Sequence, residues 1–187
     1  MITDLLLRPV TAVDLVEISA LHARVFGPGR FARTAYRVRE ATRFASPFCR
    51  AIVGADDRII AAIRYTEIAI GGRAGVLLLG PLAVEPAHAN QGHGRRLMDA
   101  GTEAARGAGL ELIVLVGDAP YYGRLGFAPI PHGQVMLPGP VDPARLLALE
   151  LVDGATAKFR GMVVAAQAAR GDQVLRCGRA SREPQAT

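Results

Sequence analysis

The chain has 187 residues, of which half are hydrophobic and 21% are charged. This size and balance predict one soluble globular domain with a core that needs no disulfide or metal, and they exclude a disordered chain. Cys49 and Cys177 lie far apart and indicate neither a disulfide framework nor a zinc site. We see no secretory leader and no apolar run of about 18 residues, so we expect a cytoplasmic protein that does not enter membranes.

The net charge of +5 does not indicate a nucleic-acid partner. Lys158 is the only lysine, the arginines are scattered, and part of the excess charge falls in the polar stretch from residue 170 onward. Aromatic residues make up 5% of the chain and tryptophan is absent, which argues against a surface for stacking bases. We predict a single domain over residues 1–168 and a flexible tail over 169–187.

The first elements in chain order are a strand at residues 5–10 and a helix that ends at the glycines of 27–29. Thr11 and Asp14 have the spacing of residues that satisfy free amides at a helix start. A second helix is predicted over residues 33–44, where polar and apolar residues are mixed.

Three β-rich runs come next, at residues 49–53, 58–70 and 76–84. Tight turns at 54–57 and 71–75 join them, so we expect antiparallel neighbours.

A helix then presents Leu97, Gly101, Ala104 and Ala108 on one face, and an apolar run at 110–116 follows it. A strand, a helix and a strand in succession predict a right-handed parallel crossover. Beyond it we expect an irregular connection over 128–143, a short helix or strand at 145–151, and a last strand at 161–166. The order predicts an α+β fold with a mixed sheet.

The loop before the helix is suited to an anion. The first amides of a helix have no partner inside it, and Gly92 and Gly94 would let a phosphate approach them. His93, Arg95 and Arg96 would supply further donors. Gly-x-Gly also occurs in plain turns; a Walker loop is excluded because no Lys-Ser or Lys-Thr follows, and the missing third glycine disfavours a Rossmann loop.

A second motif lies after the apolar run, where Tyr122 is followed by Gly126 and Phe127 in "YYGRLGF". With this motif the sequence resembles the GNAT N-acetyltransferase superfamily from about residue 76 to 130, and "LGPLAVEP" resembles its YhbS-type branch. The family pattern Gln/Arg-x-x-Gly-x-Gly/Ala is met by Gln91 and Gly94, while Arg96 replaces the usual small residue.

The resemblance implies a layered GNAT fold: a mixed, mostly antiparallel sheet with helices on both faces and splayed fourth (76–84) and fifth (111–116) strands. Acetyl-CoA would bind in the gap, with its pantetheine along the fourth strand and its pyrophosphate on the glycine loop. The implied binding residues are Leu82, Ala83, Val84, Gln91, Gly92, His93, Gly94, Arg95 and Arg96.

Tyr122 would act as the catalytic acid that protonates the leaving sulfur, although a tyrosine here can also simply cap the sheet. We expect Tyr121 to pack and Asp118 to cap a helix. The carboxylate that many relatives carry on the fourth strand is replaced by Gly80 and Pro81, so Glu67, Glu85 or a water chain are left as routes for the amine's proton.

The predicted activity is direct transfer of an acetyl group from acetyl-CoA to an amine, without a metal. A non-catalytic acyl-CoA sensor is the alternative, and salt-dependent nucleic-acid binding is a third reading. The acceptor, the acyl-chain preference and a homodimer are left open. The acceptor site is expected between the early helices and the stretch from 129 to 143.

Overall fold

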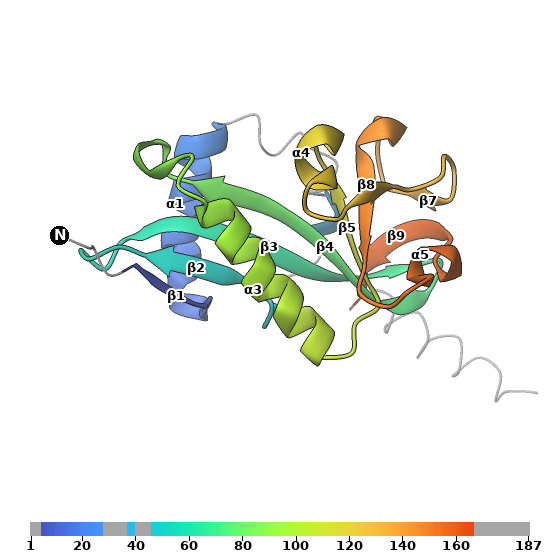
Figure 1. Ribbon diagram of the computed structural model, residues 1–187, viewed down its shortest axis with the longest axis horizontal. Coiled ribbons are helices and arrows are strands. Elements are labelled where there is room, and N and C mark those ends of the chain that lie inside the picture. The colour runs from blue at the N-terminus through green and yellow to red at the C-terminus, as the bar shows by residue number, and fades with distance from the viewer. Residues whose placement is uncertain (1–4, 28–36, 40–45, 167–187) are drawn as a thin grey trace, which may run out of the picture.

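The computed structural model describes residues 5–27, 37–39 and 46–166 (Figure 1). The strands are β1 (Leu6–Pro9), β2 (Arg50–Val53), β3 (Ile59–Ile70), β4 (Arg73–Val84), β5 (Leu112–Val116), β6 (Ala128–Pro129), β7 (Val135–Met136), β8 (Leu146–Glu150) and β9 (Gly161–Ala165). The α-helices are α1 (Leu15–Phe26), α3 (His93–Gly107), α4 (Ala119–Gly123) and α5 (Ala155–Lys158), and 3-10 turns are η1 (Ala12–Asp14), η3 (Pro86–His88) and η4 (Pro143–Arg145).

Two of the predicted segments fall largely outside these ranges. Of the helix expected over 33–44, only residues 37–39 are described, and they are helical. The predicted tail at 169–187 and the end of the predicted domain lie outside the described residues.

The strands form one mixed sheet in the order β1-β2-β3-β4-β5-β8-β6. Along this order every neighbouring pair is antiparallel except β4 and β5, which are parallel. Strand β9 adds to the far end of β3 and also pairs with β7. The structure confirms the three antiparallel strands that the turns predicted, β2, β3 and β4. It also confirms the parallel crossover from β4 to β5 that the apolar runs predicted.

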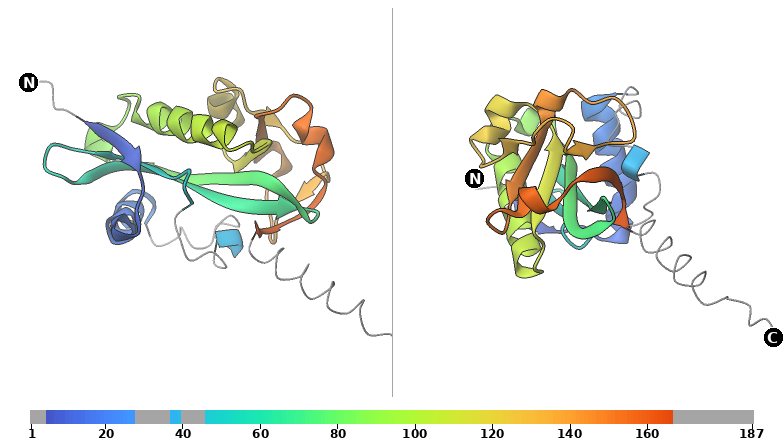
Figure 2. Two further views of the ribbon diagram at one scale, coloured as in Figure 1. Left: turned by 90° about the horizontal axis from the view of Figure 1, so that it is seen from below. Right: turned by 90° about the vertical axis from the view of Figure 1, so that its right-hand side faces the viewer.

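Helices cover both faces of the sheet, as predicted. Helix α3 lies on one face and α1 on the other, with residues 37–39 on the side of α1 (Figure 2). The core beneath α3 includes Tyr65, Leu77 and Leu97, whereas Leu21 of α1 packs with Ala62 in a separate cluster. Burial of these apolar side chains is the main driving force that holds the helices on the sheet.

Helix α3 approaches β3 most closely at Gly101. A Cβ atom at Gly101 would lie 2.8 Å from Cζ of Tyr65 and would overlap its ring. The Tyr65 hydroxyl donates to the carbonyl of Met98 at 3.2 Å, so the ring is held beneath the helix. The small residue on this helix face is therefore required by packing.

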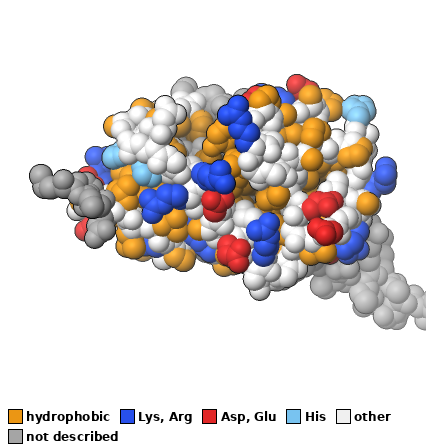
Figure 3. Space-filling model, viewed as in Figure 1, with side chains coloured by type: hydrophobic (Ala, Val, Ile, Leu, Met, Phe, Trp, Pro, Cys, Tyr) orange, Lys and Arg blue, Asp and Glu red, His pale blue; other side chains and the backbone are white. Residues whose placement is uncertain are grey.

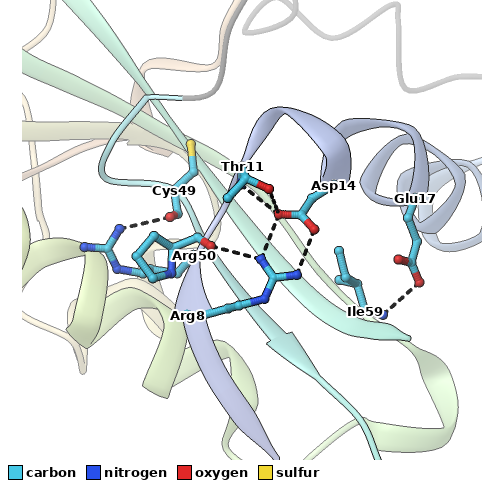
Figure 4. A network of polar contacts seen from close by, with 8 residues as sticks. Arg8, Thr11, Asp14, Glu17, Cys49, Arg50 and Ile59 are labelled. Carbon is cyan, nitrogen blue, oxygen red and sulfur yellow. Dashed lines mark hydrogen bonds and ion pairs between the residues drawn. The ribbon is translucent and has the colours of Figure 1, made fainter. Parts of the chain in front are cut away.

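The start of α1 is fixed by a polar network (Figure 4). The Asp14 carboxylate accepts from the Thr11 amide at 2.7 Å and from the Arg8 guanidinium at 2.8 Å on each oxygen. The predicted capping pair is confirmed, with one difference: Thr11 caps the 3-10 turn η1, and α1 itself begins at Leu15. Glu17 then ties α1 to the sheet by accepting from the Ile59 amide at 2.8 Å.

The C-terminal part is more regular than its glycines and prolines suggest. The stretch predicted to be irregular contains the short strands β6 and β7. The run at 145–151 was compatible with either a helix or a strand. Most of it forms strand β8, and β8 pairs with β5 over the whole length of the strand. Hydrogen bonding to β5 makes this segment a strand, since a short apolar run alone is compatible with a helix or a strand.

Candidate active site

The sheet opens between β4 and β5. These strands pair only where Val76–Leu78 face Leu112–Val114. Further along, β5 continues to pair with β8, while the β5-facing edge of residues 79–84 has no strand partner among the described residues. The predicted splay is therefore present, and it leaves backbone groups of β4 available to a ligand.

A β-bulge in β4 lies where the strands separate. Tyr65 of β3 pairs with Leu79 and Ile63 pairs with Leu82, so β4 has one extra residue at Gly80 and Pro81. Gly80 has a φ of 109°, which favours glycine. A bulge bends a strand and increases its twist, which directs the end of β4 away from β5.

The N-terminus of α3 lies beside this opening and has no side-chain cap. Gly92 is the N-cap residue at a φ of 79°, and the Arg96 amide donates to its carbonyl at 3.1 Å. A Cβ atom at Gly92 would meet no atom within 4 Å, so the approach to the helix end is open. The amides of His93, Gly94 and Arg95 have no acceptor inside the helix, and they form the positive end of the helix dipole.

Gly94 connects the helix start to both sides of the opening. A Cβ atom there would lie 3.3 Å from Cδ2 of Leu82 on β4 and 3.7 Å from the hydroxyl oxygen of Tyr121 on α4. The structure thus brings together the predicted phosphate loop, the predicted pantetheine strand and the tyrosine motif.

The basic residues of the loop differ in character. Arg95 and Arg96 are exposed, and Arg95 lies 3.6 Å from Asp99 in an ion pair. His93 is 4% exposed, and burial, with the nearby charges of Arg96 and His88, lowers its pKa. We therefore expect a neutral His93 at pH 7, so the positive charge for a diphosphate would come from the two arginines and the helix dipole.

The tyrosine motif folds into α4 and the turn after it. Asp118 caps α4 by accepting from the Tyr121 amide at 3.2 Å, as predicted. The Phe127 amide returns to the carbonyl of Tyr122 at 3.2 Å, and the two rings lie 5.7 Å apart between centroids. Gly126, with a φ of 88°, makes this return, which explains the Gly-Phe pair of the motif.

The Tyr122 ring is held at the end of β5. A Cβ atom at Gly117 would lie 2.7 Å from Cδ2 of Tyr122, so the ring contacts the backbone just after the strand. Burial raises the pKa of Tyr122, with a smaller contribution from Tyr121. The phenol therefore stays protonated at neutral pH and can act as a proton donor.

The sequence alone predicts that Tyr121 packs. It does pack edge-to-face on Tyr122, with centroids 5.0 Å apart, but it is also 46% exposed and its hydroxyl lies near Gly94. Its place at the opening depends on the contact between α4 and α3, which no local pattern encodes.

The two carboxylates suggested as bases differ in their surroundings. Glu85 forms an ion pair with Arg24, and the Arg24 Nε donates to Oε1 of Glu85 at 2.7 Å. Glu67 is exposed on β3 opposite Leu77, on the α3 side of the sheet. A base therefore stays unassigned.

The stretch expected to help build the acceptor site contacts residues 37–39 of the second predicted helix. Arg37 Nη1 lies 3.5 Å from the carbonyl oxygen of Pro138, and Val38 packs in one cluster with Leu137. A cavity of about 450 Å³ is lined by residues of this stretch, among them Ile130 and Val141. The two predicted acceptor regions thus meet on the side of the sheet opposite α3.

Neither the charges on the face that carries α3 nor the metal ligands among the described residues mark another site. On the face that carries α3, Lys and Arg side chains alternate with acidic and apolar ones instead of forming one patch (Figure 3). Among the residues described, no three His, Cys, Asp or Glu side chains gather to hold a metal ion. None of the described helices is long and apolar enough to span a membrane.

The site combines a parallel strand pair that opens with an uncapped, glycine-started helix beside it, and comparisons with known proteins relate this arrangement to acetyltransferases. The acetyltransferase (GNAT) domain family matches residues 48–129. The uncharacterized N-acetyltransferase YjhQ of Escherichia coli is 29% identical over 119 residues, which are 62% of this chain and 65% of YjhQ. The match thus spans less than two thirds of that relative.

Solved structures show the same fold. YhbS from Escherichia coli in complex with CoA gives a TM-score of 0.76 at 23% identity, over 88% of this chain and 91% of that one. A GNAT family acetyltransferase from Brucella melitensis in complex with acetyl-CoA gives 0.55 at 26% identity, over 81% and 97%. The chain therefore has the GNAT fold, as its motifs predicted.

Proposed function

We propose that this protein is a cytoplasmic N-acetyltransferase that moves the acetyl group of acetyl-CoA directly to an amine. The observation that carries the proposal is the unpaired edge of β4 beside the uncapped N-terminus of α3. The CoA and acetyl-CoA complexes of the YhbS and Brucella proteins support it, because they have the same fold. A cytoplasmic location fits the free thiol of Cys49, which is buried.

The cofactor fits the residues at the opening. Backbone groups of Leu82, Ala83 and Val84 would pair with the amides of the pantetheine arm, as an added strand does. The diphosphate would lie on amides between Gln91 and Arg96, where Gly92 leaves the approach open. The guanidinium groups of Arg95 and Arg96 would add charge-assisted contacts.

The chemistry moves protons at nitrogen and at sulfur. The neutral amine attacks the thioester carbonyl, a C–N bond forms, and the attacking nitrogen releases a proton to water; the C–S bond breaks, and the departing sulfur takes a proton. We assign that proton to the Tyr122 phenol, whose raised pKa keeps it protonated. An amine with a pKa of about 10.4 must first lose a proton at a cost of roughly 4 to 5 kcal/mol near pH 7, and we assign this step to water.

An acyl-CoA sensor without catalysis is the second candidate. It is favoured by the bulge itself, where Gly80 and Pro81 carry no carboxylate that could act as a base. A sensor would bind acetyl-CoA and transfer nothing to a broad panel of amines.

Tyr122→Phe distinguishes the two functions. We expect kcat for thiol release in the presence of an amine to fall by about 100-fold or more, because the thiolate loses its acid. The affinity for acetyl-CoA, measured by calorimetry, should change by less than about threefold. Tyr121→Phe is the matched control on the same helix and should keep most of kcat. Unchanged turnover in Tyr122→Phe would remove Tyr122 from the mechanism.

A further inference from the structure

A buried arginine lies at the β4 bulge on the face of the sheet opposite α3. Arg39 is 5% exposed, and its Nη2 lies 3.6 Å from the position of a Cβ atom at Gly80. Its neighbour Val38 packs in the same core cluster as Leu78 of β4. The guanidinium therefore reaches the point at which β4 leaves β5, which is where the thioester would lie.

A second arginine faces the same point from β3. Ile63 and Tyr65 both pack in the core beneath α3, so Arg64 between them points to the opposite face. Because Ile63 pairs with Leu82 and Tyr65 with Leu79, Arg64 lies directly across from the extra residue of the bulge. Arg64 is thus the β3 residue opposite the bulge, on the same face as Arg39.

Thr66 adds a hydroxyl on this face. It is 4% exposed, and its Oγ1 has no hydrogen-bond partner among the described residues. It pairs with Leu78, so it shares a face with Arg64 two residues before it. A buried hydroxyl without a partner is uncommon in folded proteins and is explained when a ligand or a water supplies the partner.

We propose that the acceptor carries a carboxylate beside its amine, in the manner of a small amino acid, and that Arg39 binds this carboxylate at the bulge. This inference rests on the proposed acetyltransferase function. A guanidinium forms two parallel hydrogen bonds with a carboxylate, which both orients and discriminates a small acceptor. Arg64 and Thr66 line the same face and complete the recognition of the acid. Amines without a carboxylate, such as polyamines, would lack this contact and are disfavoured.

The test compares each amino acid of a panel with its own carboxamide at saturating acetyl-CoA. We expect the wild-type protein to prefer the carboxylates by at least about tenfold in kcat/KM, through a lower KM. Arg39→Gln should remove this preference by raising KM for the acids about tenfold or more, with kcat much less affected. Arg58→Gln, an exposed arginine on the turn between β2 and β3, is the control and should keep the preference.

Calorimetry with acetyl-CoA separates the outcomes. If acetyl-CoA binds and amides or polyamines are acetylated as well as the acids, the inference is wrong and the proposed function stands. If no amine is acetylated, both are wrong. Arg64→Gln is the second variant if Arg39→Gln does not fold. If Arg64→Gln keeps the wild-type preference for carboxylates over carboxamides, that result would also count against the proposed carboxylate site.

Discussion

At the scale of single residues, the site depends on how burial changes the acids and bases that line it. Burial raises the pKa of Tyr122 above its ordinary value of about 10 and lowers that of His93. Both shifts favour the neutral form, since removal from water disfavours charge. The opening therefore has a neutral phenol at the end of β5, and the phosphate loop carries its charge on Arg95 and Arg96 and not on His93.

The pH dependence of transfer follows from Tyr122. Its phenol must be protonated, and a raised pKa means that the proton is lost only above about pH 10. The rate should therefore rise from pH 7 as the amine loses its proton and should show no falling limb below about pH 10. Initial rates in overlapping buffers provide the measurement, and Tyr122→Phe should keep the rising limb at lower amplitude. A falling limb between pH 7 and 9 would contradict this role.

Asp14 gives a prediction for stability. The hydrogen bond from Arg8 is the main cause that lowers the pKa of Asp14, so the carboxylate stabilises the fold above its unfolded pKa of about 3.9. This contribution is lost as the pH falls below that value toward the lower folded pKa. Asp14→Asn should cost about 1 to 3 kcal/mol at pH 7, measured by urea unfolding.

The same experiment at low pH supplies the control for Asp14. The difference between Asp14→Asn and the wild-type protein should shrink as the pH drops below about 4, because the wild-type carboxyl then takes up its proton. A difference that stays constant down to pH 2 would assign the effect to packing and not to charge.

At the scale of elements, α3 is the part that joins the core to the site. Its N-terminus forms the proposed phosphate loop, and its middle packs on β3 at Gly101. A shift of the helix along β3 would move the loop relative to Leu82. Packing beneath the helix therefore sets the geometry of the opening.

Gly101→Ala tests this packing. The added methyl group would overlap the Tyr65 ring, so we expect a loss of about 1 to 3 kcal/mol in the free energy of unfolding. Gly107→Ala in the same helix is the matched control, because a Cβ atom there meets no atom within 4 Å. It should be neutral or stabilise by up to about 1 kcal/mol. Equal effects of the two changes in thermal or urea unfolding would argue against the close contact.

At the scale of the whole molecule, the part that could be predicted from sequence is the part encoded locally. The tight turns predicted the antiparallel hairpins, and the glycine loop with the Tyr122 motif indicated the GNAT fold. Thr11 and Asp14 marked a helix start, although they could not show that a 3-10 turn precedes α1.

The remainder depends on contacts between distant segments. The pairing of β9 with β3 joins residues nearly a hundred positions apart, and no periodicity reveals it or the pairing of β9 with β7. The place of Tyr121 over Gly94 and of Arg39 over Gly80 likewise follows from the packing of whole elements. A sequence pattern can name the residue types of a site, whereas their neighbours follow from tertiary structure.

The most direct test of the account is calorimetric titration with acetyl-CoA and with acetyl-pantetheine, which lacks the diphosphate and the nucleotide. If amides at the start of α3 hold the diphosphate, two or more charge-assisted hydrogen bonds of about 1.5 to 3 kcal/mol each are lost with it. We predict one acetyl-CoA site per chain and binding of acetyl-pantetheine that is at least about 100-fold weaker. Gly94→Val should weaken acetyl-CoA in the same direction, while Gly107→Ala should not. No heat with acetyl-CoA, or equal affinity for the two ligands, would contradict the account.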